Sequence, residues 1–136
     1  MSRRPGAAAL LLTAVLALAG CSSAPIDPAL TSAVAAAISS GASAQLGLEL
    51  DDKGGILPGT LTALLGDMAD NLSGTEKELE MHQAADAADA EYRAQALSGV
   101  RASLEAVHVA QGGDPSAGLD ALTASVEDLR ALEKTG

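Results

Sequence analysis

Apolar residues recur at helical spacing over most of the chain, and turn-forming residues divide this pattern into four segments. The clearest segment begins near Pro58 and ends before Gly74, which is a ready C-terminal cap. Its apolar stripe has the 3.6-residue period of an amphipathic helix and consists of Leu57, Leu61, Leu64, Leu65, Met68 and Leu72. No run alternates β-branched or aromatic residues with polar ones, so the sequence predicts no strand.

Two Asp-Pro pairs predict the starts of the first and last helices. In Asp27-Pro28 and Asp114-Pro115 the Asp is a favourable N-cap and the proline fits the first helical position. The last helix is expected to reach Lys134, with an apolar stripe of Leu119, Leu122, Val126, Leu129 and Leu132. The first is expected to end near Leu50, before the turn residues 51–55. Its apolar positions recur at every fourth residue and are Leu30, Val34, Ile38, Ala42, Leu46 and Leu50.

A third helix is expected directly after Gly74, because Thr75 and Glu78 form a capping box. The segment is rich in Ala, lacks Pro, and is expected to run unbroken to about Gln111, with at most a bend at Ser98-Gly99. Its predicted buried face consists of Met81, Ala85, Ala88, Tyr92, Ala96, Val100, Leu104 and Val107. Four helices on short connections predict an all-α fold, an antiparallel bundle of about four helices over residues 28–134.

The first 20 residues have the parts of a secretory signal peptide. Arg3 and Arg4 make a positive start, and an apolar run of 13 residues follows from Ala7 to Ala19, interrupted only by Thr13. A helix of this length reaches about 20 Å, short of the ~30 Å hydrocarbon core of a bilayer. The run therefore predicts a cleaved signal rather than a membrane-spanning anchor.

The apolar run ends in Leu18-Ala19-Gly20-Cys21, which contains the single cysteine of the chain. These four residues resemble the lipobox of bacterial lipoproteins. The resemblance implies cleavage after Gly20 and a diacylglycerol thioether on Cys21, and it places the protein on the extracytoplasmic face of the cell membrane. Residues 1–20 would then be the signal peptide and residues 21–27 a short tether. The alternative is a secreted protein cut after Gly20 or near Ala24, with Cys21 incidental.

The charge and the aromatic content exclude several classes of partner. The net charge is −10, from 8 basic and 18 acidic residues, and loss of Arg3 and Arg4 with the signal peptide makes it about −12. Nucleic acid is excluded because phosphate binding needs clustered Lys and Arg. Anionic headgroups should repel the chain, so the acyl chains on Cys21 are its expected membrane contact. Tyr92 is the single aromatic residue, which disfavours stacking on bases or sugars.

One candidate for cation binding lies on the predicted third helix. Glu78, His82, Asp86, Asp89 and Arg93 follow in steps of three or four, so one continuous helix would align them on one ridge. A His and a carboxylate one turn apart can chelate a divalent transition ion weakly. The ordinary alternative is a solvated face with Glu78–His82 and Asp89–Arg93 pairs.

The remaining chemical motifs are incomplete. Glu105 and His108 have the Glu-x-x-His spacing of a di-iron bundle, but the chain lacks the second copy that such a site needs. Segment 49–60 resembles a calcium loop, yet Lys53 and Thr60 occupy two of its ligand positions. There is no Gly-x-Ser-x-Gly elbow and no phosphate-binding loop. We expect no enzymatic activity and no cofactor.

These observations lead to two hypotheses of function. The first is a lipid-anchored envelope protein whose helical domain acts by contact, with an envelope protein partner or by self-association. The second is a lipoprotein that binds a small ligand or a divalent metal for transport or sensing. An Ala-lined bundle should pack shut, whereas a binding protein needs a pocket of several hundred cubic ångströms, here near His82 or Tyr92.

Overall fold

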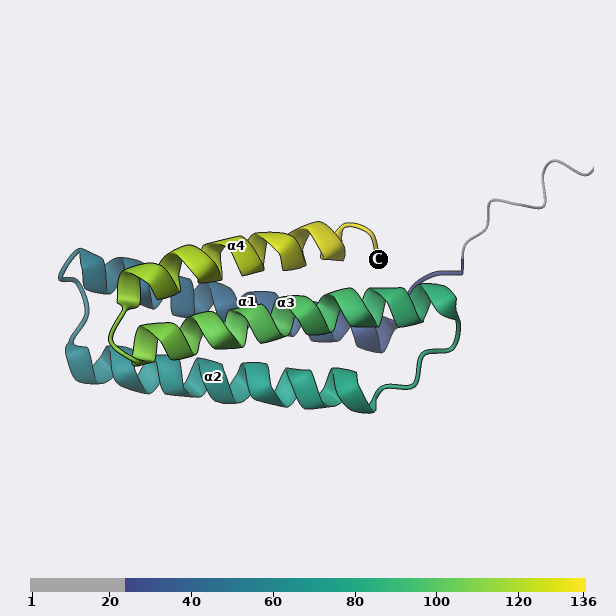
Figure 1. Cartoon of the computed structure of the whole chain (residues 1–136), viewed down its shortest axis with the longest axis horizontal. Helices are drawn as coiled ribbons and strands as arrows, with labels where there is room; N and C mark the ends of the chain where they lie inside the picture. The colour runs from purple at the N-terminus through teal and green to yellow at the C-terminus, as the bar shows by residue number, and fades with distance from the viewer. Residues whose placement is uncertain (1–23) are drawn as a thin grey trace, which may run out of the picture.

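The computed structural model describes residues 24–136, and within that range it contains four α-helices and no strand. The helices run alternately up and down, which confirms the predicted all-α antiparallel bundle (Figure 1). Their bounds are α1 (Pro28–Asp52), α2 (Pro58–Met81), α3 (Ala87–Gln111) and α4 (Pro115–Glu133). The predicted signal peptide, with Gly20 as its predicted cleavage site, and the predicted lipidation site Cys21 lie outside the described residues.

The bundle is flattened rather than square. Helices α1 and α3 lie between α2 and α4, which sit on opposite sides and do not approach each other (Figure 1). Residues 24–27, the α2–α3 turn and the C-terminus share one end of the bundle, which we name the tether end. The α1–α2 and α3–α4 turns form the far end. None of the helices in residues 24–136 is apolar over enough of its length to cross a bilayer.

Both Asp-Pro starts are confirmed. The carboxylate of Asp27 accepts a hydrogen bond from the N–H of Ala29 at 2.8 Å, and that of Asp114 accepts one from Ala117 at 3.0 Å. These bonds satisfy backbone donors that the first turn of a helix leaves unpaired. The core between the helices is mainly aliphatic, and its largest fully buried apolar side chains are Leu30, Leu48, Leu72, Leu79, Leu122, Leu129, Val34, Val100, Val107 and Val126.

The predicted buried stripe of α1 is only partly right. Leu46 and Leu50 are 57% and 37% exposed, whereas Leu48, outside the predicted stripe, is 2% exposed. At 100° per residue, each step of four residues rotates the stripe by about 40°, so it leaves the core side along the helix. The face that is buried keeps a true helical period and consists of Leu30, Ala33, Val34, Ala37, Gly41, Ala44, Gly47 and Leu48.

The predicted boundary between the second and third helices is wrong. Helix α2 continues through Gly74 to Met81, and α3 begins at Ala87. Thr75 is not an N-cap but a buried residue within α2, and its hydroxyl donates to the carbonyl of Asn71 at 3.1 Å. Met81, predicted to be buried, is 77% exposed at the end of α2, and Ala85 and Ala88 are also exposed.

The length of the bundle explains the position of this break. A single helix over residues 75–111 would measure about 55 Å, whereas the 25 residues of α1 measure about 37 Å. The excess would extend beyond its neighbours with nothing to cover its apolar side. Breaking the chain after Met81 produces helices of 24 and 25 residues that match α1. Tertiary packing thus outweighs the high helix propensity of Ala84 and Ala85.

Replacing Gly74 with Ala tests the continuity of α2. Gly74 has ordinary helical geometry, and an added Cβ would meet nothing within 4 Å. We therefore expect G74A to raise the free energy of unfolding by about 0.5–1 kcal/mol, measured by urea denaturation followed by circular dichroism. The control is G113A, which should destabilise the protein because Gly113 has a φ of +105°. Destabilisation by G74A would mean that α2 ends at Gly74.

Candidate functional site

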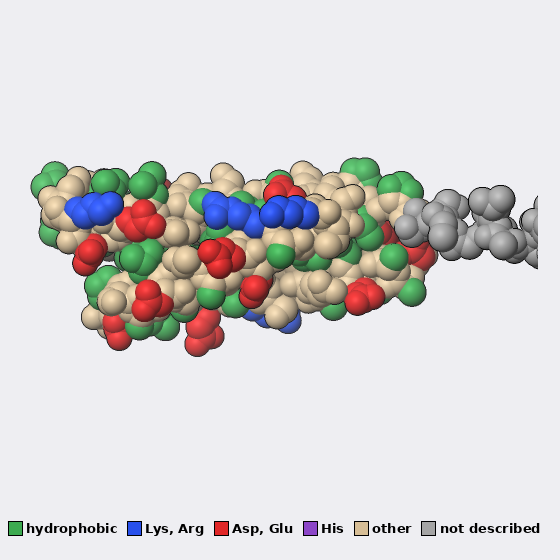
Figure 2. Space-filling model, turned by 90° about the horizontal axis from the view of Figure 1, so that it is seen from above, with side chains coloured by type: hydrophobic (Ala, Val, Ile, Leu, Met, Phe, Trp, Pro, Cys, Tyr) green, Lys and Arg blue, Asp and Glu red, His purple; other side chains and the backbone are tan. Residues whose placement is uncertain are grey.

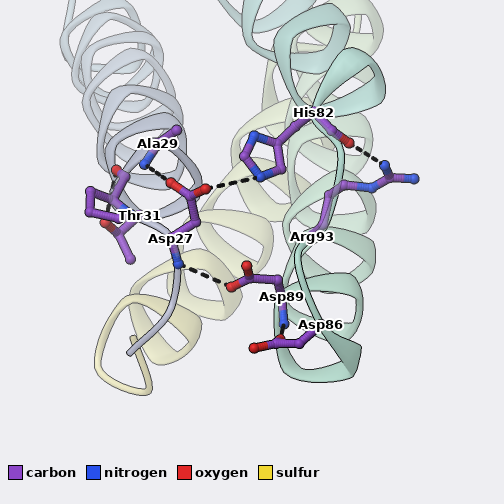
Figure 3. Close-up of polar contacts among 8 residues, drawn as sticks. Asp27, Ala29, Thr31, His82, Asp86, Asp89 and Arg93 are labelled. Carbon is purple, nitrogen blue, oxygen red and sulfur yellow. Dashed lines mark hydrogen bonds and ion pairs between the residues drawn. The ribbon is translucent and has the colours of Figure 1, made fainter. Parts of the chain in front are cut away.

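Polar side chains gather at the tether end, where Asp27 connects three parts of the fold (Figure 3). Its backbone N–H donates to Oδ1 of Asp89 on α3 at 3.0 Å. Its own Oδ1 caps α1, and its Oδ2 lies 3.5 Å from Nε2 of His82. We name Asp27, His82, Asp86, Asp89 and Arg93 the tether-end cluster. The cluster ties the start of α1 to the α2–α3 turn.

The α2–α3 turn owes its shape to hydrogen bonds within this cluster. Oδ1 of Asp86 accepts from the N–H of Asp89 at 2.8 Å and so caps α3. The guanidinium of Arg93 donates to the carbonyl of His82, the first residue after α2 (Figure 3). Asp89 occupies the third position of α3, the position from which a Glu or Gln in a capping box bonds back to the N–H of the N-cap. Here it is 4% exposed and accepts the N–H of Asp27 instead.

The predicted cation-binding ridge is not formed, because residues 82–86 leave the helix. Glu78 is exposed on α2, and Asp86 is used as a helix cap. His82 Nε2 is within ion-pair distance of Asp27, but it has no hydrogen-bond partner among residues 24–136. In the same range, no three His, Cys, Asp or Glu side chains are arranged to hold a metal ion. A single imidazole–carboxylate contact replaces the ridge.

A second feature is an open depression along α3 and α4, which we name the α3–α4 groove. It consists of two adjoining hollows with volumes of about 430 and 280 Å³. The larger is lined by residues that include Gln95, Gly99, Ala102, Asp128, Ala131 and Leu132. The smaller lies nearer the tether end and is lined by residues that include Ile26, Glu91, Tyr92, Gln95, Leu132 and Thr135. The two hollows share Gln95, Leu132 and Thr135 in their linings, so they lie next to each other.

Small side chains leave this groove open. Ala102 and Ala131 are exposed on the two helices and do not bridge the space between them. At Gly99 the space of a missing Cβ is taken by Leu129, whose Cδ2 is 2.6 Å from the position a Cβ would occupy. Leu129 is thereby drawn into the core, at 1% exposed, instead of covering the groove. The result is an apolar floor with polar residues along its edges.

Tyr92 contributes a buried polar group to the lining. Its side chain is 4% exposed, and its hydroxyl has no hydrogen-bond partner among the described residues. Burial raises the pKa of Tyr92 above its ordinary value, and the negative charge of Glu133 raises it further. The phenol is therefore neutral at physiological pH and keeps a proton to donate. A buried donor without an acceptor is unusual in a folded protein.

The charged side chains elsewhere on the surface are mostly carboxylates. Figure 2 shows carboxylates scattered over the face it draws, with few basic side chains among them. Arg101 on α3 bonds to Glu76 and Glu80 of α2 at 2.6 Å each, and these two hydrogen bonds raise the pKa of its guanidinium, that to Glu76 most. The large exposed apolar side chains lie at the two ends, with Leu46, Leu50, Leu57 and Val109 toward the far end and Met81 at the tether end.

Comparison with known proteins identifies no relative of this chain: no family model, curated protein or solved structure matches it. Similarity therefore assigns no function. The residues that sequence reasoning missed are Asp27 as a contact of His82 and Asp89, and Gln95 and Thr135 as groove residues. No sequence signal could reveal the Asp27–Asp89 contact, because 62 residues separate its two members.

Proposed function

We propose that the protein is a lipid-anchored surface protein of the bacterial envelope whose helical bundle acts by contact. The observation that carries this proposal is Leu18-Ala19-Gly20-Cys21 after a short apolar run. Two or three acyl chains on Cys21, at about 0.8 kcal/mol for each buried methylene, make an anchor that hardly dissociates. In this proposal the mature protein begins at Cys21 and faces the extracytoplasmic side of the cell membrane.

The start of the bundle supports a close attachment to the membrane. Ile26 packs against the core, and Asp27 is bonded to α1 and to Asp89. The free tether is thus limited to the residues between Cys21 and Ile26, which reach at most about 17 Å when extended. The tether end would face the bilayer, and the far end would project about 37 Å beyond it along α1.

The polar groups of the bundle serve as helix caps and backbone contacts, which supports a non-enzymatic role. In the tether-end cluster, Asp27 and Asp86 cap helices, while Asp89 and Arg93 bond to backbone atoms. These groups hold the fold together and do not converge on a space that a substrate could enter. The bundle would therefore act as an interaction or structural module, through an envelope protein or through its own copies.

A small-ligand or metal-binding lipoprotein for transport or sensing is the second candidate. The α3–α4 groove favours it, because its larger hollow of about 430 Å³ falls in the usual range for ligand pockets and it continues to Tyr92. Such pockets, however, enclose most of their ligand, and this one is open along its length. An open groove suits a contact surface better.

Labelling with radioactive palmitate in the native host tests the anchor. We expect label in the wild-type protein and none in C21S, because only the thiol of Cys21 can start the lipid modification. S22A is the matched control and should be labelled normally. Equal labelling of wild type and C21S would contradict the proposal, as would an unlabelled wild type released into the medium after cleavage near Ala24.

A further inference from the structure

We propose that the α3–α4 groove is a docking site for an amphipathic helix of a partner protein. The helix would place apolar side chains in the groove and Lys or Arg along its edges. This inference rests on the proposed contact function and specifies the surface that makes the contact and the chemistry of its partner.

The shape of the groove fits a helix. Along α3 the lining runs from Ala88 to Ala102, a rise of about 21 Å or roughly four helical turns. Its members on α3 keep helical spacing, so the two hollows lie in line on one face of this helix. An amphipathic helix in a groove is anchored by residues at i, i+3, i+4 and i+7, and the small side chains of Ala102 and Ala131 leave room for them.

The charge of the groove selects a basic partner. Glu91 and Asp128 contribute to the lining, and neither hollow has a Lys or Arg in its lining. The chain as a whole carries a net charge of −10. Like charges across an interface disfavour a second copy of this chain, whereas Lys or Arg flanking an apolar stripe would be complementary to both carboxylates.

A pair of synthetic peptides tests the proposal. Each has about 14 residues, a length that spans the groove. Both have Leu at i, i+3, i+4 and i+7; one carries Lys at the remaining positions and the other Glu. Binding of the fluorescently labelled peptides to the full mature protein is measured by fluorescence anisotropy. If the protein is acylated, it is held in phosphatidylcholine nanodiscs, and empty nanodiscs are the blank. We expect the Leu/Lys peptide to bind at least 10-fold more tightly than the Leu/Glu peptide.

Two matched pairs of variants locate the binding. A131L fills the groove and should weaken binding of the Leu/Lys peptide at least 10-fold, whereas A121L adds the same side chain at an exposed position of α4 outside the lining and should not. D128N should weaken binding about 2- to 5-fold, as expected for an edge charge. E127Q removes a neighbouring carboxylate that is not in the lining and should have no effect.

Three results would overturn the proposal. The first is equal binding by A131L and A121L, which would move the site elsewhere, for example to the exposed leucines of the far end. The second is equal affinity for the two peptides. The third is a dimer, seen by sedimentation, that A131L abolishes, which would make a second copy the occupant. Because binding is measured whether or not the protein is acylated, failure of the palmitate experiment would leave this test unaffected.

Discussion

Replacing Leu48 with Ala should lower the free energy of unfolding by about 2–5 kcal/mol. Leu48 is 2% exposed at the far end of α1, and its removal leaves a cavity in addition to the lost burial of apolar surface. A small domain has only about 5–15 kcal/mol of stability in total, so this single change is a large fraction of it. The measurement is a urea titration followed by circular dichroism, with the midpoint and slope compared with wild type.

The matched control is L46A, two residues away on the same helix. Leu46 is 57% exposed, and both Leu and Ala favour the helix, so the change should stay within about 0.5 kcal/mol. Which of the two substitutions is more damaging discriminates between the predicted and the observed buried face of α1. If L46A were the more damaging substitution, the every-fourth-residue stripe would face the core and the observed rotation of α1 would be wrong.

Replacing Gly118 with Ala should also destabilise the protein strongly, by about 1–3 kcal/mol. Helix α4 crosses α3 so closely here that a Cβ on Gly118 would lie 2.6 Å from Cβ of Ala110 and 2.8 Å from the carbonyl oxygen of Ala106. The carbonyl belongs to the α3 backbone, which cannot rotate away, so the two helices must separate. This cost exceeds the gain of about 1 kcal/mol that Ala normally brings to a helix interior.

The control for this substitution is G66A on α2, where a Cβ would meet nothing within 4 Å. It should stabilise the protein by about 0.5–1 kcal/mol, because Ala loses less backbone entropy than Gly on folding. Thermal and urea unfolding of both variants give the comparison. A neutral or stabilising G118A would mean that α3 and α4 are farther apart than the structure places them, and the depth of the groove they line would change with them.

Small residues along α3 and α4 account both for the close packing at Gly118 and for the open groove. Toward the far end, Gly118 of α4 lies against Ala106 and Ala110 of α3. A buried bond of 2.9 Å joins Ser103 to Ser125 farther along the same interface. Nearer the tether end, Ala102 and Ala131 are exposed and no large side chain covers the space. The helices thus touch at one end and expose a strip at the other, which is where the proposed partner would dock.

The sequence by itself determined the fold class and most helix boundaries, because those depend on local chemistry. Asp27-Pro28 and Asp114-Pro115 cap helices wherever they occur, and the turns at residues 53–57 and 112–114 contain glycines with positive φ. The apolar period of α2 and α4 identified their buried sides, except that Leu57 of the predicted α2 stripe is 74% exposed at the N-cap. Buried Leu65 and Leu72 on α2, and Leu122, Val126, Leu129 and Leu132 on α4, were all predicted.

Only the tertiary structure decided where α2 ends and which side of α1 is buried. The segment around Gly74 and Thr75 has good signals for a helix boundary, and Ala84-Ala85 has good signals for a helix. In the structure α2 continues through Gly74 and the chain leaves the helix at Ala84-Ala85, because the helices match the lengths of their neighbours. In α1 the choice between Leu46 and Leu48 depends on what α2 and α4 place opposite them. The Asp27–Asp89 bond and the α3–α4 groove join residues far apart in sequence, and local propensity carries no information about such contacts.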